Sequence, residues 1–354
     1  MFEINITDRN LLSHLYLHVL IDSQGLTDFT LMGDILCSAN MLDDAHLSSF
    51  AAIEPNTDSN LKKLIIFTEG LYLQQLTQVT EALQGYLDVI FYRVIKVEGI
   101  SGFAVCVYVA LKTQDNLNKQ LENVANRFSV ELCLVDKTPS LLEPGLLLMD
   151  MDSTVIAVEC IDEIAALAGV GKQVSAVTAQ AMQGKLDFTQ SLRTRVACLA
   201  DADELILRQV RDALPLMPGV ANLVKTLKSY DWKIAIASGG FSYFADYLKD
   251  RLGLDAAIAN DLEIHNTKLT GRVQGRIIDA NVKAQTLKML AAEWFISPSQ
   301  TIAMGDGAND LVMMNAAALG VACHAKPVVR QQADIAIRRG GLDSLLWVLE
   351  AGKT

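Results

Sequence analysis

The chain of 354 residues has few features of a secreted, membrane-spanning or zinc-binding protein. No apolar run approaches the roughly 18–20 residues needed to cross a bilayer. The segment that starts at Met1 also has neither the basic nor the apolar region of a signal peptide. The six cysteines are scattered without a Cys-x-x-Cys pair, so we expect reduced core thiols in a cytoplasmic protein. The five histidines are equally dispersed, which argues against a zinc site.

The chain also has fewer basic than acidic residues, 30 lysines and arginines against 41 aspartates and glutamates. The net charge of −11 argues against a broad nucleic-acid surface, because such a surface needs a basic face. Hydrophobic residues make up 51% of the chain and there are only 7 prolines, which is typical of globular structure. The length predicts two or three domains with sizeable cores. We therefore expect neither nucleic acid nor membrane among the partners of this protein.

The region 146–354 alternates strands and helices, which predicts an α/β domain with a parallel sheet covered by helices on both faces. A hairpin is expected over 260–275. The interval of about 158–218 is almost wholly helical in character and follows the first strand directly, so it predicts a helical cap that acts as a lid. Further strands are expected at 233–238, 256–260, 301–305, 319–323 and 334–337, and helices at 244–252, 281–294, 310–317 and 342–351.

Residues 61–138 have a different pattern, with the βαββαβ order of a ferredoxin-like α+β domain. This segment resembles the ACT regulatory modules of amino-acid metabolism in its element order and in the Glu69-Gly70 turn after the first strand, where those modules often hold a small ligand. A purely structural or dimerising domain fits the pattern equally well, so a homodimer through this domain is a further expectation. Residues 1–60 show no pattern that we can assign.

The first strand of the α/β domain, Leu146-Leu147-Leu148, runs into Asp150 and Asp152. Polar groups at this position lie outside the carboxyl ends of the strands, where α/β sheets place their chemistry. Asp150 is the candidate nucleophile, since a carboxylate can attack phosphorus and form an aspartyl phosphate. Asp152 is the candidate general acid and base, and its crowding by Asp150 favours the protonated form that a general acid needs.

Two further signals fit the handling of a phosphate group. Ser238, Gly239 and Gly240 follow the expected strand at 233–238, and a hydroxyl with free backbone N–H groups forms a cradle for phosphate oxygens. Lys283 lies near the start of the helix at 281–294. A positive charge there would offset the charge on a phosphoryl group and restrain the nucleophile.

The last signal is the sequence Gly-Asp-Gly-Ala-Asn-Asp at 305–310, directly after a buried strand. Asp306 is expected beside Asp150, where the two carboxylates would share a hard cation. Mg²⁺ suits a site with few carboxylates, several waters and a substrate phosphate. Asp310 is one helical turn beyond Asp306 and is expected to hold metal-bound water, and Asn309 to donate to a phosphate oxygen.

In this order, these four motifs resemble those of the haloacid dehalogenase superfamily. Over 146–340 the chain closely resembles its phosphoserine phosphatase family, and the resemblance implies a Rossmann-like sheet with a helical cap. It also implies that Mg²⁺ is held by Asp150, the backbone carbonyl of Asp152, and Asp306. The implied substrate contacts are Ser238, Gly239, Gly240, Lys283 and Asn309 for the phosphate, Glu159 for the ammonium, Arg195 for the carboxylate, and Met182 and Phe188 for closing the pocket.

The expected activity is therefore the Mg²⁺-dependent hydrolysis of O-phospho-L-serine to L-serine and phosphate, the last step of serine synthesis. Ion-pumping ATPases share a similar GDGxND motif, but they have a threonine in place of Asp152 and need membrane helices. Phosphothreonine or phosphohomoserine as substrate, and transfer to an acceptor other than water, are the enzymatic alternatives. An amino-acid-sensing regulator without activity is the alternative from another class.

Overall fold

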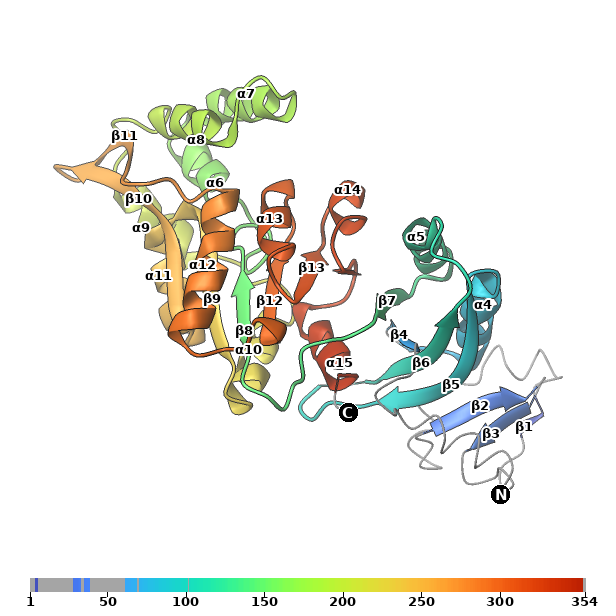
Figure 1. Ribbon diagram of the computed structural model, residues 1–354. Coiled ribbons are helices and arrows are strands. Elements are labelled where there is room, and N and C mark those ends of the chain that lie inside the picture. The colour runs from blue at the N-terminus through green and yellow to red at the C-terminus, as the bar shows by residue number, and fades with distance from the viewer. Residues whose placement is uncertain are drawn as a thin grey trace. The chain divides into compact units, whose positions relative to one another are not determined.

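A computed structural model describes residues 61–68, 70–100 and 102–352, and the backbone of three short strands nearer the N-terminus (Figure 1). The chain forms two compact units, residues 1–141 with 334–354, and residues 142–333. The expected strand over 334–337 is present as β14 (Ile335–Ile337), and residues 334–354 belong to the first of these units. Within this unit, Glu131 Oε1 accepts hydrogen bonds from the backbone N–H groups of Arg338 and Arg339 at 2.9 and 2.6 Å.

The first unit contains an antiparallel sheet in the order β5-β6-β4-β7, with the βαββαβ connectivity expected of a ferredoxin-like domain. Its core lies between the sheet and the two helices, where Leu64, Val107, Leu76 and Val124 are buried. The elements are β4 (Lys62–Phe67), α4 (Leu73–Leu83), β5 (Leu87–Ile95), β6 (Ala104–Leu111), α5 (Leu117–Phe128) and β7 (Glu131–Val135). The C-terminal segment of the chain adds β14 (Ile335–Ile337), η4 (Leu342–Ser344) and α15 (Leu345–Glu350) to this unit.

Three short strands extend this sheet beyond β5. They are β1 (Ile4–Asn5), β2 (Asp28–Met32) and β3 (Ile35–Ser38), in the order β1-β3-β2-β5. The register places Asp28 opposite Arg93. The sequence gave no assignable pattern for 1–60, and strands of two to five residues are too short to show a clear period. The rest of 1–60, and Glu69 of the expected ligand turn, lie outside the described residues.

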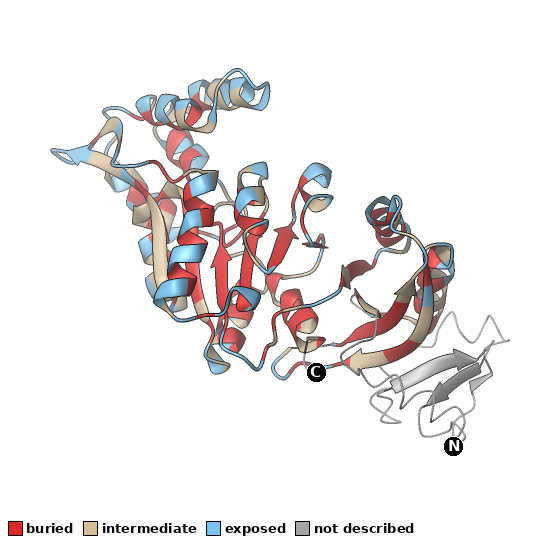
Figure 2. Cartoon of the chain, viewed as in Figure 1, coloured by how far each residue is buried: buried red, intermediate tan, exposed pale blue. Residues whose placement is uncertain are grey.

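The second unit is built on a sheet whose strands follow the order β11-β10-β9-β8-β12-β13. All neighbouring pairs are parallel except the β10–β11 hairpin, which was expected over 260–275. The central strand consists of Leu146, Leu147, Leu148 and Met149, all fully buried (Figure 2). The strands are β8 (Leu146–Met149), β9 (Lys233–Phe241), β10 (Ala256–His265), β11 (Lys268–Gln274), β12 (Thr301–Gly305) and β13 (Leu319–Cys323).

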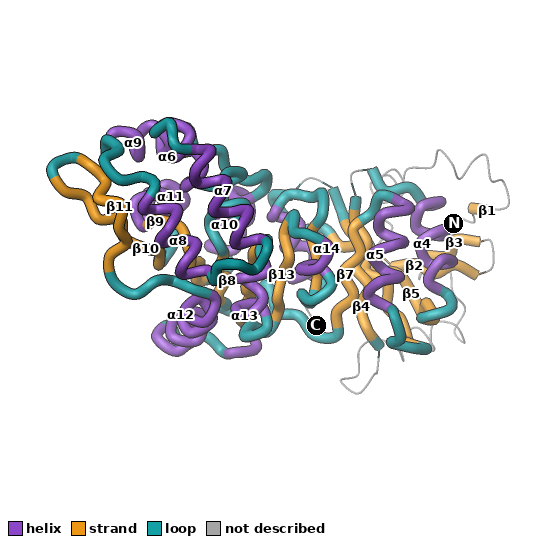
Figure 3. The backbone as a smooth tube through the Cα atoms, turned by 90° about the horizontal axis from the view of Figure 1, so that it is seen from above, coloured by secondary structure: helices purple, strands orange, loops and turns teal. Residues whose placement is uncertain are grey.

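Helices cover both faces of this sheet, with α10 and α11 on one side and α12 and α13 on the other (Figures 1 and 3). These helices are α10 (Val220–Ser229), α11 (Ser242–Leu252), α12 (Ala280–Glu293) and α13 (Leu311–Met314), and α14 (Pro327–Arg330) follows β13. The expected helix over 310–317 is shorter, because a 3-10 turn, η3 (Ala308–Asp310), precedes α13 and the chain must turn after Met314 to begin β13. Ala318 then donates its N–H to the Thr301 carbonyl.

The expected helical insertion is present between β8 and α10. It contains α6 (Cys160–Leu167), α7 (Gly171–Met182), α8 (Phe188–Ala197) and α9 (Leu205–Asp212). Helix α8 begins with a capping box, in which the Asp187 side chain accepts from the Gln190 N–H and the Gln190 side chain accepts from the Asp187 N–H. The cap lies at the end of the sheet where β8 and β12 finish (Figure 1). In the part of the chain that the structure describes, no helix is long and apolar enough to cross a membrane.

Candidate active site

Asp150 lies immediately after β8, held by the neighbouring strand and by its own loop. Its N–H donates to the Met304 carbonyl of β12 at 2.9 Å, and its Oδ1 accepts from the Met151 N–H at 2.7 Å. Only 7% of Asp150 is exposed. The parallel register between β8 and β12 therefore fixes this carboxylate where the two strands end, as the sequence predicted.

Lys283 is 1% exposed and lies between two carboxylates. Its Nζ is 2.8 Å from Asp150 Oδ1 and 2.7 Å from Asp310 Oδ1. Lys283 lies near the start of helix α12, whose N-cap residue Asp279 accepts a hydrogen bond from the Val282 N–H through its side chain. Burial by itself lowers the pKa of Lys283, but Asp150 and Asp310 outweigh this effect and raise the pKa above its usual value. Lys283 is therefore a fixed positive charge against the candidate nucleophile.

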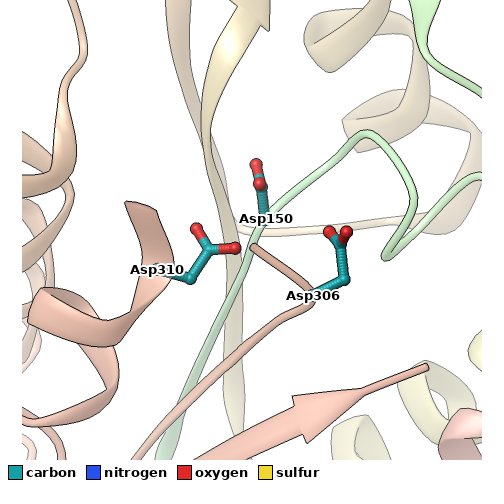
Figure 4. Close-up of side chains that lie close together, drawn as sticks. All are labelled: Asp150, Asp306 and Asp310. Atoms are coloured by element: carbon teal, nitrogen blue, oxygen red, sulfur yellow. The ribbon is translucent and has the colours of Figure 1, made fainter. Parts of the chain in front are cut away.

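Asp150, Asp306 and Asp310 form a cluster in which one oxygen of each lies within 4.8 Å of the others (Figure 4). Thr154 Oγ1 donates to Asp306 Oδ1 at 3.2 Å. Burial, and then the charges of Asp150 and Asp310, raise the pKa of Asp306 to about 7. A group of carboxylates that repel one another in a buried place is a donor set that fits a hard divalent cation. Asp310 has its oxygens committed to Lys283 and to the Gly307 N–H at 3.0 Å, which fits a supporting position behind Asp306.

Asp152, in the loop after β8, lines the same cavity as Asp150 and Asp306. Its Oδ1 accepts from the Cys160 N–H at 2.9 Å. Burial raises the pKa of Asp152 to about 7, and the nearby Glu159 adds to this effect, with a smaller contribution from Asp150. Burial, and not the expected crowding by Asp150, is therefore the main cause that favours the protonated form. A carboxyl group with this pKa can both give and take a proton near neutrality.

Ser238, Gly239 and Gly240 lie in the last part of β9, which continues to Phe241 instead of ending at Ser238, and the pairing of β9 with β10 shifts register there. A Cβ on Gly239 would lie 2.6 Å from Phe188 Cζ, and one on Gly240 would lie 2.5 Å from Asp152 Oδ2, so a larger residue at either position would displace a side chain of the site. Ser238 is 1% exposed and its Oγ accepts from the Gly240 N–H at 2.9 Å. The expected cradle therefore lies against the candidate acid Asp152.

Most of the predicted site residues line one cavity of about 200 Å³. Arg195 lines it from α8, and its buried Nε has no hydrogen-bond partner among the described residues. The predicted site residues that line this cavity are Asp150, Asp152, Glu159, Phe188, Arg195, Ser238, Gly239, Gly240, Asp306 and Asn309. Lys283 and Asp310 are buried beside Asp150 and do not line this cavity.

Met182, which was expected to close the pocket, does not line the cavity. It ends helix α7 and is 72% exposed. In this conformation of the cap its side chain is directed to solvent. Met182 therefore does not enclose the cavity, contrary to the prediction.

Three residues near the site were not among the predicted site residues. Asn260 is 1% exposed, and its side chain donates to the Gly239 carbonyl and accepts from the Ile278 N–H, both at 2.9 Å. It therefore ties the Ser238–Gly240 part of β9 to the segment that leads into α12. Ser153 donates to Glu159 Oε1 at 2.9 Å, and Thr154 holds Asp306. Ser153 and Thr154 belong to the recognised motif, but Asn260 is only an asparagine at a strand end.

Comparison with known proteins agrees with this geometry. A family model for haloacid dehalogenase-like hydrolases matches residues 145–318. The phosphoserine phosphatase of Vibrio cholerae is 53% identical over 235 residues, which is 66% of this chain and 72% of that protein. The phosphoserine phosphatase of Haemophilus influenzae is 56% identical over 222 residues, which is 63% of this chain and 71% of that protein.

Solved structures give the same result. A probable phosphoserine phosphatase from Vibrio cholerae in its unliganded form has a TM-score of 0.71 at 44% identity, covering 82% of this chain and 87% of that one. A substrate-bound phosphoserine phosphatase complex has a TM-score of 0.56 at 39% identity, covering 58% of this chain and 99% of that one. The chain belongs to the phosphoserine phosphatase family of the haloacid dehalogenase-like hydrolases.

Proposed function

We propose that the chain hydrolyses O-phospho-L-serine to L-serine and phosphate, the last step of serine synthesis. One observation carries this proposal. A single cavity presents Asp150, Asp152 and Ser238 together with Glu159 and Arg195. The first group suits a phosphate ester, and the second supplies an anion and a bidentate cation for the ammonium and carboxylate of an amino acid.

In the first step, a carboxylate oxygen of Asp150 attacks phosphorus while the ester P–O bond to the substrate breaks. Asp152 donates its proton to the departing alkoxide, which leaves as the serine hydroxyl. Lys283 restrains Asp150 through the contact at 2.8 Å and adds positive charge beside the phosphoryl group. Ser238, Gly239 and Asn309 bind the phosphate oxygens in this proposal.

In the second step, Asp152 as a carboxylate takes a proton from the water that attacks phosphorus. The bond between phosphorus and Asp150 then breaks, which releases phosphate and restores both carboxyl groups. A pKa of about 7 fits Asp152 for both steps, because a useful fraction of each protonation state exists near neutral pH.

The cation in this proposal is Mg²⁺, held by Asp150, the backbone carbonyl of Asp152, and Asp306. When bound, it supplies positive charge that offsets the phosphate and the clustered carboxylates. The raised pKa of Asp306 supports this assignment, since the cluster is poorly balanced by protein groups alone. Asp310 and Thr154 would keep their present contacts and orient Lys283 and Asp306.

The first test is phosphate release from O-phospho-L-serine with Mg²⁺ and with excess EDTA. We expect turnover with Mg²⁺ and loss of nearly all activity after chelation, restored when Mg²⁺ is added back. O-phosphothreonine, phosphohomoserine and a sugar phosphate form the comparison panel, and an added alcohol acceptor tests for phosphoryl transfer. Absence of activity on every ester would favour the amino-acid-sensing alternative, and full activity in EDTA would contradict the Mg²⁺ site.

Arg195→Ala tests the recognition of the substrate carboxylate. We expect kcat/KM for phosphoserine to fall by about 10²-fold, mainly through KM, because a charge-assisted bidentate contact of roughly 2–3 kcal/mol is lost. Phosphoethanolamine lacks the carboxylate and should lose much less. The control is Arg193→Ala, an exposed arginine on the same helix. Equal losses on the two substrates would show that Arg195 does not contact the carboxylate.

The roles of the first unit stay predictions. Pairing of two copies through the ferredoxin-like domain predicts a dimer mass in light scattering. Binding of a small effector, as in the ACT modules that it resembles, predicts a heat signal when L-serine is titrated into the full chain.

A further inference from the structure

A second cavity, of about 520 Å³, adjoins the first. Asp306, Gly307 and Asn309 line both cavities and so form the wall between them. The far side of the second cavity is formed by His324, Lys326 and Val328, which are all exposed. The phosphate site proposed above is thus bordered on one side by the substrate cavity and on another by a separate opening to solvent.

The topology explains why this opening lies beside the phosphate site. Strands β12 and β13 are parallel neighbours, with Gly305 opposite Ala322. Their carboxyl ends therefore place the Asp306–Asn309 loop next to His324 and Lys326. Helix α14 begins immediately after Lys326, and Val328 on its first turn lies at the edge of the cavity.

The two cavities differ in charge. The substrate cavity is lined by the carboxyl groups of Asp150, Asp152, Glu159 and Asp306, with the guanidinium of Arg195 among them. The second cavity carries Asp306, the ammonium of Lys326 and the imidazole of His324 as its titratable groups. Once a cation binds Asp306, the second cavity is the more favourable environment for an anion, because opposite charge attracts and water is available to solvate it.

We propose that the phosphate product leaves through this second cavity and that Lys326 binds it on the way. The inference rests on the proposed phosphatase function. Serine and phosphate then depart by different routes, serine on the side covered by the cap and phosphate past Asn309 and Lys326. The cavity is several times larger than the roughly 30 Å³ that one water molecule occupies, so it can hold a hydrated phosphate ion.

The experiment uses the full chain with Mg²⁺ and two variants. Lys326→Gln removes the charge, and Val328→Trp places a large side chain at the edge of the cavity, where Val328 is 56% exposed. The matched controls are Lys288→Gln and Met289→Trp, which change exposed residues of α12 that line neither cavity. Thermal unfolding establishes that all four variants are folded.

Two quantities are measured, the inhibition constant of inorganic phosphate and the ratio of the first-turnover rate of serine formation to the steady-state rate. We expect Lys326→Gln to raise the inhibition constant about five- to tenfold, the effect of one lost charge-assisted contact. Val328→Trp should raise the ratio of rates several-fold, seen as a burst of serine in rapid quench, because phosphate release becomes slower. The controls should match the wild type in both measurements.

Wild-type behaviour of either Lys326→Gln or Val328→Trp in its own measurement would overturn the proposed route. This failure differs from failure of the proposed function. If the wild-type chain does not hydrolyse phosphoserine, the function itself is wrong. If it does and the variants behave like the controls, only the exit route is wrong.

Discussion

Asp150→Asn is expected to abolish turnover, with kcat lower by at least about 10⁴-fold, the scale seen when a nucleophile is removed from a set of groups that act together. The amide is nearly isosteric with the carboxylate but is a poor nucleophile toward phosphorus. It also removes one of the charges that pair with Lys283 at 2.8 Å. The expected result has a simple physical origin, which is that the amide cannot form the aspartyl phosphate through which the proposed route passes.

The decisive measurement for Asp150 is covalent labelling. Wild-type chain quenched in acid during turnover of phosphate-labelled substrate should retain about stoichiometric label at Asp150, and Asp150→Asn should retain none. Asp246→Asn, an exposed carboxylate on α11, is the control for an acid-to-amide change. Label on the Asp150→Asn chain, or turnover within tenfold of the wild type, would remove Asp150 from its role.

Lys283→Met should have the second largest effect, on stability as well as on activity. The lysine is 1% exposed and holds Asp150 and Asp310 at 2.8 and 2.7 Å, so its removal leaves two buried carboxylates without their cation. Breaking a buried ion pair on one side typically costs about 3–5 kcal/mol of unfolding free energy. We expect a loss of that size in urea unfolding, together with a loss of about 10²–10³-fold in kcat.

A double variant separates the two effects of Lys283. In Lys283→Met with Asp310→Asn, one of the two unpaired charges is gone, so part of the unfolding free energy should return while kcat stays low. Lys288→Met, an exposed lysine on the same helix, should change neither quantity. Recovery of activity along with stability in the double variant would mean that Lys283 acts only by keeping the fold intact.

The destabilisation by Lys283→Met is expected to depend on pH, because a carboxylate that has lost Lys283 can take up a proton. The pKa of Asp310 is already raised by burial and by Asp150, against the lowering effect of Lys283. Without the lysine, Asp310 would take up a proton more readily. The destabilisation of Lys283→Met should therefore be smaller at pH 5 than at pH 8, because protonation removes the charge that has lost its partner.

Much of the site could be predicted because a parallel sheet places the ends of its strands together. Asp150, Ser238 and Asp306 each follow an apolar run, and β8, β9 and β12 are adjacent in the sheet. An apolar strand followed by a polar residue therefore specifies both the element and its position at the catalytic edge. The ferredoxin-like order of the first unit followed from the same kind of pattern, in which β-strands and amphipathic helices differ in their period.

Other features could not be read from residue order. Met182 was expected to enclose the substrate, but its exposure depends on the position of the cap, and local sequence does not encode that position. Asn260 joins Gly239 of β9 to Ile278 through its side chain, and this contact brings together segments that are far apart in the sequence.

The sequence by itself determined which chemical groups are present and at which strand ends they emerge, because the alternation of apolar and polar segments is local. Only the tertiary structure decided how strongly these groups act on one another. The pKa of Asp152 near 7 comes mainly from burial by neighbouring segments, and the charge of Lys283 is held by carboxylates from two other elements. Desolvation and Coulomb energy depend on distances between residues far apart in the chain, and those distances exist only after folding.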